Sequence, residues 1–487
     1  MLITKSIFKY INKPIFWAIM VALLYAAVTM YITIHLIHDS YNTYAFDLGI
    51  FTQELKNTLQ GQILYSPALG TSQFAIHFSP ILILLVPLYR LFPHAQMLLA
   101  VQSLLLAFGG YLIYVIAREY NYSHRASLIL EGLYFVNPLV WGVALFDFHE
   151  VAFAIPALLV MFLGMKRKNW IWFSVGFIVA LATKEDAVVA LGVFGFVMML
   201  SEYWQHKNIS KISIIIFCAA IFTYGLSVII SRLASGGESP GLLSFFTSRY
   251  AYICQPLSAA IPLAAHTIFS NDTLFLIDAY FLPLALLPLL APKWVIPALL
   301  ILLSGILSTD IGQHGQLTQY PAVAIPFLFM AFIEVLPRIK QDPQIRTILK
   351  RTNNRAIAFS LIPIVIISIF LISQGRIKLA SLPDAHDTSI NQIVASVPDN
   401  ATVTASNIIF PHLVSRTDVY LNAREGQEIA QSGGIINHVW GYPEKDTEYI
   451  IIDTKRSDIA ESDIELISSQ YTLIKKIDGV MLFQLNS

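Results

Sequence analysis

Residues 41–80 read YNTYAFDLGIFTQELKNTLQGQILYSPALGTSQFAIHFSP, and this stretch decides how the chain is organised. It has mixed polarity and lies between long apolar runs, with Asp47 near its start and His77 near its end. A polar loop of this length in so hydrophobic a chain needs a role. We interpret it as an outer-face loop that carries chemistry, with the apolar runs as its scaffold.

The composition predicts a polytopic membrane protein. Of the 487 residues, 56% are hydrophobic and only 13% are charged, whereas a soluble protein has roughly 25% charged residues. The formal net charge is zero and identifies no partner by itself; we expect membrane lipids around the chain and no nucleic acid. Cys218 lies in an apolar run and Cys254 in a polar loop, a placement that suggests neither a disulfide nor a zinc site.

Apolar runs define the expected membrane helices, each of which needs roughly 20 residues to cross the hydrocarbon. About eleven runs are candidates: 14–37, 95–117, 126–146, 151–165, 169–183, 187–204, 212–232, 274–291, 294–308, 321–337 and 356–373. Lys5, Lys9 and Lys13 precede the first run, which is too long for a signal-peptide core. We therefore expect the N-terminus to be cytoplasmic in an integral plasma-membrane protein.

Basic residues set the expected topology. If 14–37 runs outward and 95–117 is the second span, the basic clusters fall in inner loops: 118–125, 166–168, 206–211, 292–293 and 338–355. Counting 80–92 as a span would reverse this sorting, so we expect a surface helix there. The outer side then collects the unpaired acids and histidines.

The tail differs from the rest of the chain. We expect a membrane domain over 1–373 and an extracytoplasmic α/β domain over 374–487. Predicted strands cover 402–410, 418–421 and 449–453, followed by a hairpin over 471–485 that turns at Asp478-Gly479. Helices are expected at 389–397 and 459–468. No glycine-rich phosphate loop supports nucleotide binding in the tail.

Asp47 opens an amphipathic segment that we expect to rest on the bilayer surface. Its apolar stripe consists of Leu48, Phe51, Leu55 and Leu59, with Asp47 and Glu54 at the edge. Asp47 could be a general base that takes a proton from an acceptor. Alternatively, it is a helix N-cap that needs only backbone amides. His77 could bind a phosphate or metal, or share a proton with Asp47; alternatively, it is an exposed histidine at a helix start.

Two further clusters lie at expected span ends. Asp147, His149 and Glu150 in FDFHE could hold a divalent ion or form a second acid–base pair, or could be a solvated turn. The KED triplet, residues 184–186, interrupts an apolar stretch. If the triplet is exposed to water, three charges at the end of a span need no special role. If it faces FDFHE across a cleft, Lys184 could neutralise a phosphate.

The remaining candidates are substrate contacts. Besides Lys184, the KED triplet contributes Glu185 and Asp186. His314 and Tyr320 belong to a donor-rich outer loop suited to sugar or phosphate, or to a plain connection between spans. Arg249 could bind an anion.

Taken together, several motifs resemble a known family. They are FDLGIF at 46–51, HFSP at 77–80, FHE at 148–150, KED at 184–186, TQYPAVAIPFL at 318–328 and TASNIIFPHL at 404–413. The combination resembles a prokaryotic family of predicted multi-pass membrane proteins, domain of unknown function 2079, over most of the chain. That family is in turn distantly similar to GT-C glycosyltransferases.

The resemblance implies a GT-C-like fold and a catalytic carboxylate in the first outer loop, at the position of Asp47. It also implies a sugar donor on a polyprenyl phosphate, and 80–92 matches a surface helix. FDLGIF carries one acid where many relatives have an adjacent pair. We therefore predict an inverting glycosyltransferase with an unknown acceptor, in which Asp47, His77 and Glu150 are catalytic. A transporter or lipid flippase, or a non-catalytic assembly protein, is the alternative; the chain shows no repeat of the kind common in transporters.

Overall fold

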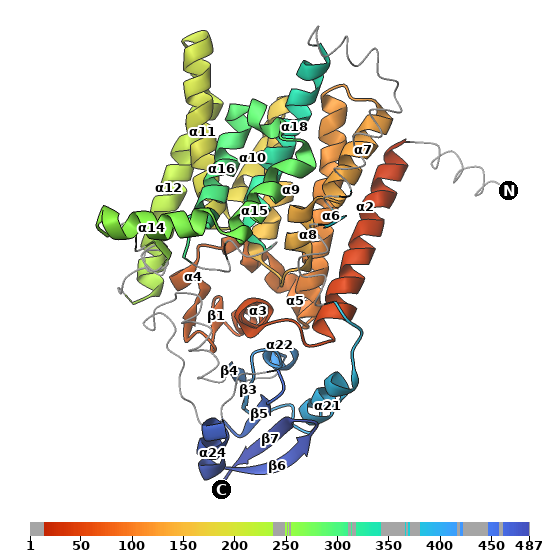
Figure 1. Cartoon of the computed structure of the whole chain (residues 1–487), viewed down its shortest axis with the longest axis vertical. Helices are drawn as coiled ribbons and strands as arrows, with labels where there is room; N and C mark the ends of the chain where they lie inside the picture. The colour runs from red at the N-terminus through yellow and green to blue at the C-terminus, as the bar shows by residue number, and fades with distance from the viewer. Residues whose placement is uncertain are drawn as a thin grey trace, which may run out of the picture.

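The computed structural model describes residues 14–236, 249–250, 252, 255–309, 313, 318–341, 366, 369–370, 380–415, 419–421, 447–456 and 461–486. A helical bundle forms one part of the molecule, and a small α/β domain caps one end of it (Figure 1). The segment after the first helix lies between the two. Of the predicted last span, 356–373, only residues 366 and 369–370 are described, and the expected domain boundary at 373–374 lies outside the described residues.

Long apolar runs produce the bundle. Its first half consists of α2 (Pro14–Tyr31), the π-helical η1 (Ile32–His38), α6 (Gln96–Glu119), α7 (His124–Phe135), α8 (Pro138–Leu145), η4 (Glu150–Phe153), α9 (Ala154–Arg167) and α10 (Trp170–Leu181). Its second half consists of α11 (Glu185–His206), α12 (Lys211–Ala234), α14 (Leu257–Ile268), α15 (Asn271–Phe281), η6 (Leu282–Leu284), η7 (Leu287–Leu290), α16 (Pro292–Ile306), η8 (Tyr320–Val323) and α18 (Ala324–Gln341).

The number of spans is smaller than the sequence predicts. In the described part of the chain, five helices are long and apolar enough to cross a membrane, or up to seven if two bent pairs each count as one span. One bend, of 51°, separates α7 from α8 at Pro138, which cannot continue the hydrogen-bond ladder of the preceding helix. The 12-residue α10 covers only about 18 Å, less than the roughly 30 Å of hydrocarbon. The eleven expected spans are therefore confirmed only in part.

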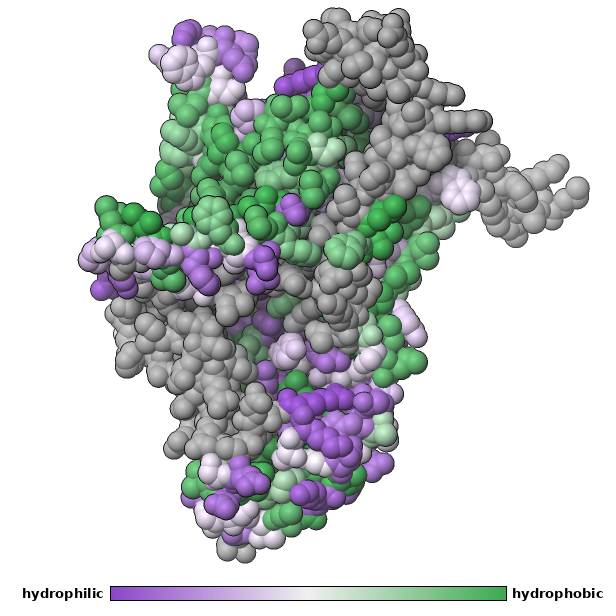
Figure 2. Space-filling view, viewed as in Figure 1, coloured by the Kyte–Doolittle hydropathy of each residue, from purple (hydrophilic) through white to green (hydrophobic). Residues whose placement is uncertain are grey.

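Hydrophobic side chains cover the visible faces of the bundle, and hydrophilic ones gather over the C-terminal domain (Figure 2). Large apolar residues such as Ile171, Phe222 and Leu233 are exposed on the bundle. An apolar surface of this size marks contact with lipid. The chain is thus an integral membrane protein.

Basic helix ends meet at the end of the bundle that lies away from the C-terminal domain (Figure 1). Arg167 at the end of α9 pairs with Glu119 at the end of α6, at 2.7 Å. Lys293 at the start of α16 lies 2.8 Å from Glu334 in α18. This gathering agrees with the predicted sorting of basic residues, and the assignment of the two faces to cytoplasm and exterior stays a prediction.

The first loop folds into short elements. They are η2 (Ala45–Gly49), α3 (Ile50–Leu59), β1 (Tyr65–Ser66), β2 (Thr71–Ser72), α4 (Gln73–Ile76), η3 (Pro80–Leu85) and α5 (Val86–Leu91). The predicted short helix over 80–92 is therefore present as η3 and α5. The predicted bilayer-facing stripe is wrong, because Leu48, Phe51 and Leu55 are buried in a core shared with the C-terminal domain.

The C-terminal domain is built on a mixed sheet. Its elements are α21 (Ala385–Val394), β3 (Val403–Ala405), α22 (Phe410–Leu413), β4 (Val419–Leu421), β5 (Tyr449–Asp453), α24 (Glu461–Gln470), β6 (Tyr471–Ile477) and β7 (Val480–Leu485). The strand order is β4-β3-β5-β7-β6. β3 pairs in parallel with β4 and β5, and the other pairs are antiparallel.

The small α/β tail is thereby confirmed, with one correction. Asp478 and Gly479 both have positive φ, as the predicted hairpin turn requires. The strand expected over 402–410 ends at Ala405. Ser406 starts a turn there, because its carbonyl accepts the amides of Ile409 and Phe410 and leads the chain into α22.

Candidate functional site

Asp47 lies in a single π-helical turn at the junction of the bundle and the C-terminal domain. The turn begins after Tyr44, whose amide donates to Asp147 Oδ2 at 2.8 Å. Asp47 Oδ1 lies 3.2 Å from His149 Nε2. The N-cap alternative for Asp47 is wrong, because Tyr44 occupies the N-cap position and the Asp47 carboxylate instead contacts a histidine from another loop.

The surroundings of His149 favour its charged form beside this carboxylate. Its Nδ1 lies 3.0 Å from the carbonyl oxygen of Asp147, and its Nε2 faces Asp47. A carbonyl oxygen and an ionised carboxylate both accept hydrogen bonds, so these two contacts favour a ring with protons on both nitrogens. Burial disfavours this charge, but Asp47 and Glu150 outweigh the penalty and raise the pKa of His149. His149 is nearly inaccessible, whereas the Asp47 side chain is 25% exposed, so Asp47 is the member of the pair that a ligand can reach.

A second buried pair lies next to the first. Glu150 is fully buried, and its Oε1 accepts from Ser79 Oγ at 3.1 Å and from Lys184 Nζ at 3.3 Å. Burial would raise the pKa of Glu150, but Lys184, His149 and His77 reverse the effect and lower it. Burial likewise opposes the charge of Lys184, and Glu150 and its acidic neighbours raise its pKa. The solvated alternatives for FDFHE and for Lys184 are therefore wrong.

His77 pairs with Glu185 at the start of α11. Its Nδ1 lies 2.5 Å from Glu185 Oε1, and the amide of Phe78 donates to Glu185 Oε2 at 3.2 Å. Glu185 stands in the first turn of α11, where the helix dipole favours a negative charge. HFSP and KED are thus joined side chain to side chain, which fixes the end of the first loop against α11.

Arg249 and Tyr320 form the outer limit of this cluster. Arg249 lies 5.9 Å from the centre of the Tyr320 ring, with Nη2 3.5 Å from the Tyr320 hydroxyl. It is also close enough to Asp186 for an electrostatic interaction. The structure therefore gathers every described residue of the predicted site into one region. His314 lies outside the described residues, and the roles of all of these residues stay predictions.

Glu54 is a buried acid. From the sequence it was placed beside Asp47 at the edge of an apolar stripe and given no role. It is fully buried in α3, and within the described residues neither carboxylate oxygen has a hydrogen-bond partner. Glu150 Oε2 is in the same situation. Burial, with the nearby charge of Glu150, raises the pKa of Glu54 well above its ordinary value and so favours its protonated form.

Gln102 holds the FDFHE segment in place through hydrogen bonds, and it was not among the site residues predicted from the sequence. Its side-chain amide donates to the carbonyls of Val143 and Phe146, and its Oε1 accepts the amide of His149 at 3.0 Å. Gln102 is buried in the middle of an apolar helix, α6. A glutamine well inside the apolar run 95–117 was the available signal, because a buried polar side chain needs partners.

No group of three or more His, Cys, Asp or Glu side chains among the residues described is arranged to hold a metal ion. The divalent ion considered for FDFHE therefore finds no ready ligand set in this part of the chain. Several polar atoms of FDFHE contact protein groups instead, namely the amide of Tyr44 and the side chains of Asp47, Ser79, Gln102 and Lys184.

The model of the DUF2079 family, described as a predicted membrane protein, matches residues 37–482. The chain belongs to this DUF2079 family. No curated protein matches significantly. Among solved structures, ArnT from Cupriavidus metallidurans in the apo state is similar, with a TM-score of 0.54 and 12% identity over 95% of this chain and 97% of ArnT. The fold of this DUF2079 protein is therefore similar to that of ArnT.

Proposed function

We propose that this DUF2079 protein is an inverting membrane glycosyltransferase that moves a sugar from a polyprenyl-phosphate donor to an acceptor at the outer leaflet. The observation that carries the proposal is the Asp47–His149 pair. It couples a partly exposed carboxylate to a buried histidine, at the junction of an apolar bundle and a polar domain. The likeness to the ArnT fold supports a glycosyltransferase scaffold.

Asp47 would act as the general base. As the anomeric carbon–oxygen bond to phosphate breaks, the acceptor oxygen forms the new bond and its proton passes to Asp47. His149 would fix the orientation of Asp47 through the 3.2 Å contact, because its own position is set by Asp147 and Gln102.

Positive groups on the other side of the cluster would stabilise the leaving polyprenyl phosphate. Arg249, half-buried beside Tyr320, is better placed for this than Lys184, whose charge is already balanced by the buried Glu150. His77, held by Glu185, would contribute from the end of the first loop. The polyprenyl chain would lie against the apolar faces of the bundle, where lipid already solvates hydrocarbon.

Asp47→Asn tests the proposal because it preserves the shape of the side chain and removes its basicity. The protein in nanodiscs would be supplied with a radiolabelled lipid extract from the producing cells, and the release of polyprenyl phosphate measured. We expect a loss of at least about 100-fold, the usual contribution of a general base. Asp39→Asn is the control, since Asp39 is a half-buried acid at the end of η1, just before the loop, and its carboxylate pairs with His35 at 2.9 Å. Equal release by Asp47→Asn and wild type would refute the assignment.

A further inference from the structure

The turn that carries Asp47 is held from the C-terminal domain as well as from the bundle. The amide of Ala45 donates to Asn407, with 2.8 Å to the side-chain Oδ1 and 3.1 Å to the backbone oxygen. The preceding amide, of Tyr44, donates to Asp147 in the bundle. Two consecutive amides, two and three residues before Asp47, are therefore fixed by acceptors from two different parts of the molecule.

These two amides are the ones that a helical turn cannot satisfy by itself. The first N–H groups of a helix have no acceptor within the helix, so outside acceptors decide where the turn begins and how it is oriented. Asp47 is the third residue of η2, and its contact with His149 depends on that orientation. A displacement of about 1 Å at a reacting group can lower a rate by about 100-fold.

Several other contacts join the same loop to the C-terminal domain. Tyr41 donates to Asn391, Gln53 to the carbonyl of Val419 and Ser40 to the carbonyl of Ser381, at 2.7–2.8 Å. Every one of these donors lies within fifteen residues of Asp47. The C-terminal domain thus contacts the loop at several points between Ser40 and Gln53. Among these hydrogen bonds, the one from Ala45 to Asn407 starts nearest to Asp47 in the sequence.

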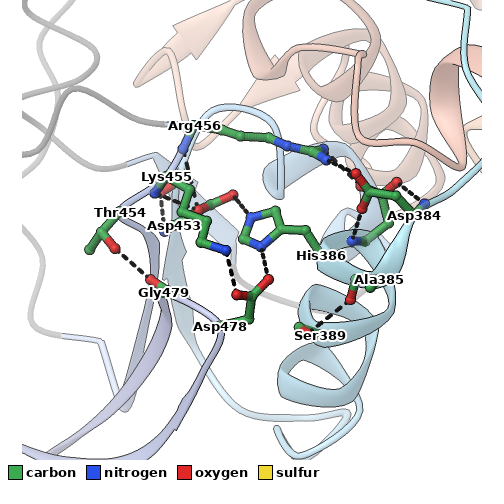
Figure 3. A network of polar contacts seen from close by, with 12 residues as sticks. Asp384, Ala385, His386, Ser389, Asp453, Thr454, Lys455, Arg456, Asp478 and Gly479 are labelled. Carbon is green, nitrogen blue, oxygen red and sulfur yellow. Dashed lines mark hydrogen bonds and ion pairs between the residues drawn. The ribbon is translucent and has the colours of Figure 1, made fainter.

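A network of charged side chains links the elements of the C-terminal domain to one another (Figure 3). His386, at the start of α21, places one ring nitrogen 2.9 Å from Asp453 at the end of β5 and the other 2.9 Å from Asp478 in the β6–β7 turn. Burial opposes a charge on His386, but these carboxylates outweigh it and raise its pKa. Arg456 pairs with Asp387 at 2.7 Å and also donates to the carbonyl of Ser40 at 3.0 Å. The network therefore ties the sheet, α21 and the first loop together.

We infer that Asn407 is a positioning residue for Asp47, and that the C-terminal domain works as a clamp that sets the orientation of the catalytic turn. This inference rests on the proposed function for its catalytic consequence. The holding of the turn itself is a structural claim that can be tested separately. The motif TASNIIFPHL then has a role: its asparagine sets the turn, and its Phe410 packs on the same turn at Gly49.

The test compares Asn407→Ala with Asn407→Asp in the full-length protein in nanodiscs. Aspartate keeps a side-chain oxygen at the acceptor position, and alanine does not. We expect amide hydrogen exchange over residues 44–49 to become about fivefold faster or more in Asn407→Ala, and kcat for polyprenyl phosphate release to fall about tenfold or more while KM changes little. Asn407→Asp should retain most of the protection from exchange over residues 44–49 and most of the wild-type kcat. Asn400→Ala, in an exposed turn of the same domain, should change neither.

Unchanged exchange in Asn407→Ala would overturn the clamp, as would an alanine variant no worse than the aspartate variant. Protection of the β5 amides reports whether the domain itself remains folded, and its loss in Asn407→Ala would assign Asn407 to domain stability instead. If the wild-type protein releases no polyprenyl phosphate, the proposed function fails, and the exchange measurement still decides whether Asn407 holds the turn.

Discussion

Gly49→Ala probes the contact between the turn that carries Asp47 and the C-terminal domain. A Cβ at position 49 would lie 2.5 Å from Cδ1 and 2.8 Å from Cε1 of Phe410. Ordinary carbon–carbon contacts are about 3.5–4.0 Å, so the turn or the ring must move by about 1 Å. Phe410 is fully buried, so its ring cannot swing out into solvent.

Two opposing effects determine the magnitude. Gly49 has φ −65° and ψ −50°, an ordinary helical conformation, so alanine would itself favour the turn by about 0.5–1 kcal/mol. Inserting a methyl group into a well-packed core costs about 1–3 kcal/mol. Because Phe410 cannot move freely, we expect the steric cost to win, with a net loss of about 1 kcal/mol. That loss is a factor of about five in the local opening equilibrium.

Hydrogen exchange over residues 44–49 measures this equilibrium, and we expect about fivefold faster exchange in Gly49→Ala. Gly132→Ala is the matched control, because a Cβ there meets nothing within 4 Å, and it should leave this segment unchanged. Combining Gly49→Ala with Phe410→Leu should cost less than the two single changes together. Exchange in Gly49→Ala that equals or is slower than that of the wild type would refute the steric argument, and so would strictly additive losses in the double variant.

Two further predictions concern pH. Burial, with the charge of Glu150, raises the pKa of Glu54, so Glu54 lowers the stability of the folded protein once the pH exceeds 4.5, the ordinary pKa of glutamate. Glu54→Gln should therefore raise the melting temperature at pH 8 but not at pH 4. An equal rise at both pH values would contradict this. Burial, and next the repulsion of His38, lowers the pKa of His412, whose ring stacks between His38 and Tyr41 at 4.1 and 4.0 Å. The contact between the C-terminal domain and the first loop should therefore weaken as the pH falls below 6.5, the ordinary pKa of histidine. Amide exchange over residues 44–49 should become faster at low pH relative to its intrinsic rate, and His412→Phe should reduce this pH dependence. An equally steep dependence in His412→Phe would show that other groups cause it.

The sequence alone was sufficient for properties that are local in the chain. The membrane class follows from composition, and the long helices α2, α6, α11 and α12 follow from continuous apolar runs. The hairpin follows from Asp478-Gly479, because these residues tolerate positive φ. The number of spans could not be read as reliably, because an apolar run of 12 to 15 residues fits a short buried helix as well as a crossing one.

Only the tertiary structure decided which polar groups meet and which of them are out of water. Ala45 and Asn407 are 362 residues apart, yet they form the contact that orients the Asp47 turn. Lys184 looked like a free cation at a span end, but packing buries it against Glu150. The stripe on α3 fits a bilayer surface as well as a protein core, and the C-terminal domain supplies the core. Hydropathy is a property of each segment, whereas pairing and desolvation depend on the packing of distant segments. The sequence therefore names the candidate residues, and the fold assigns their partners.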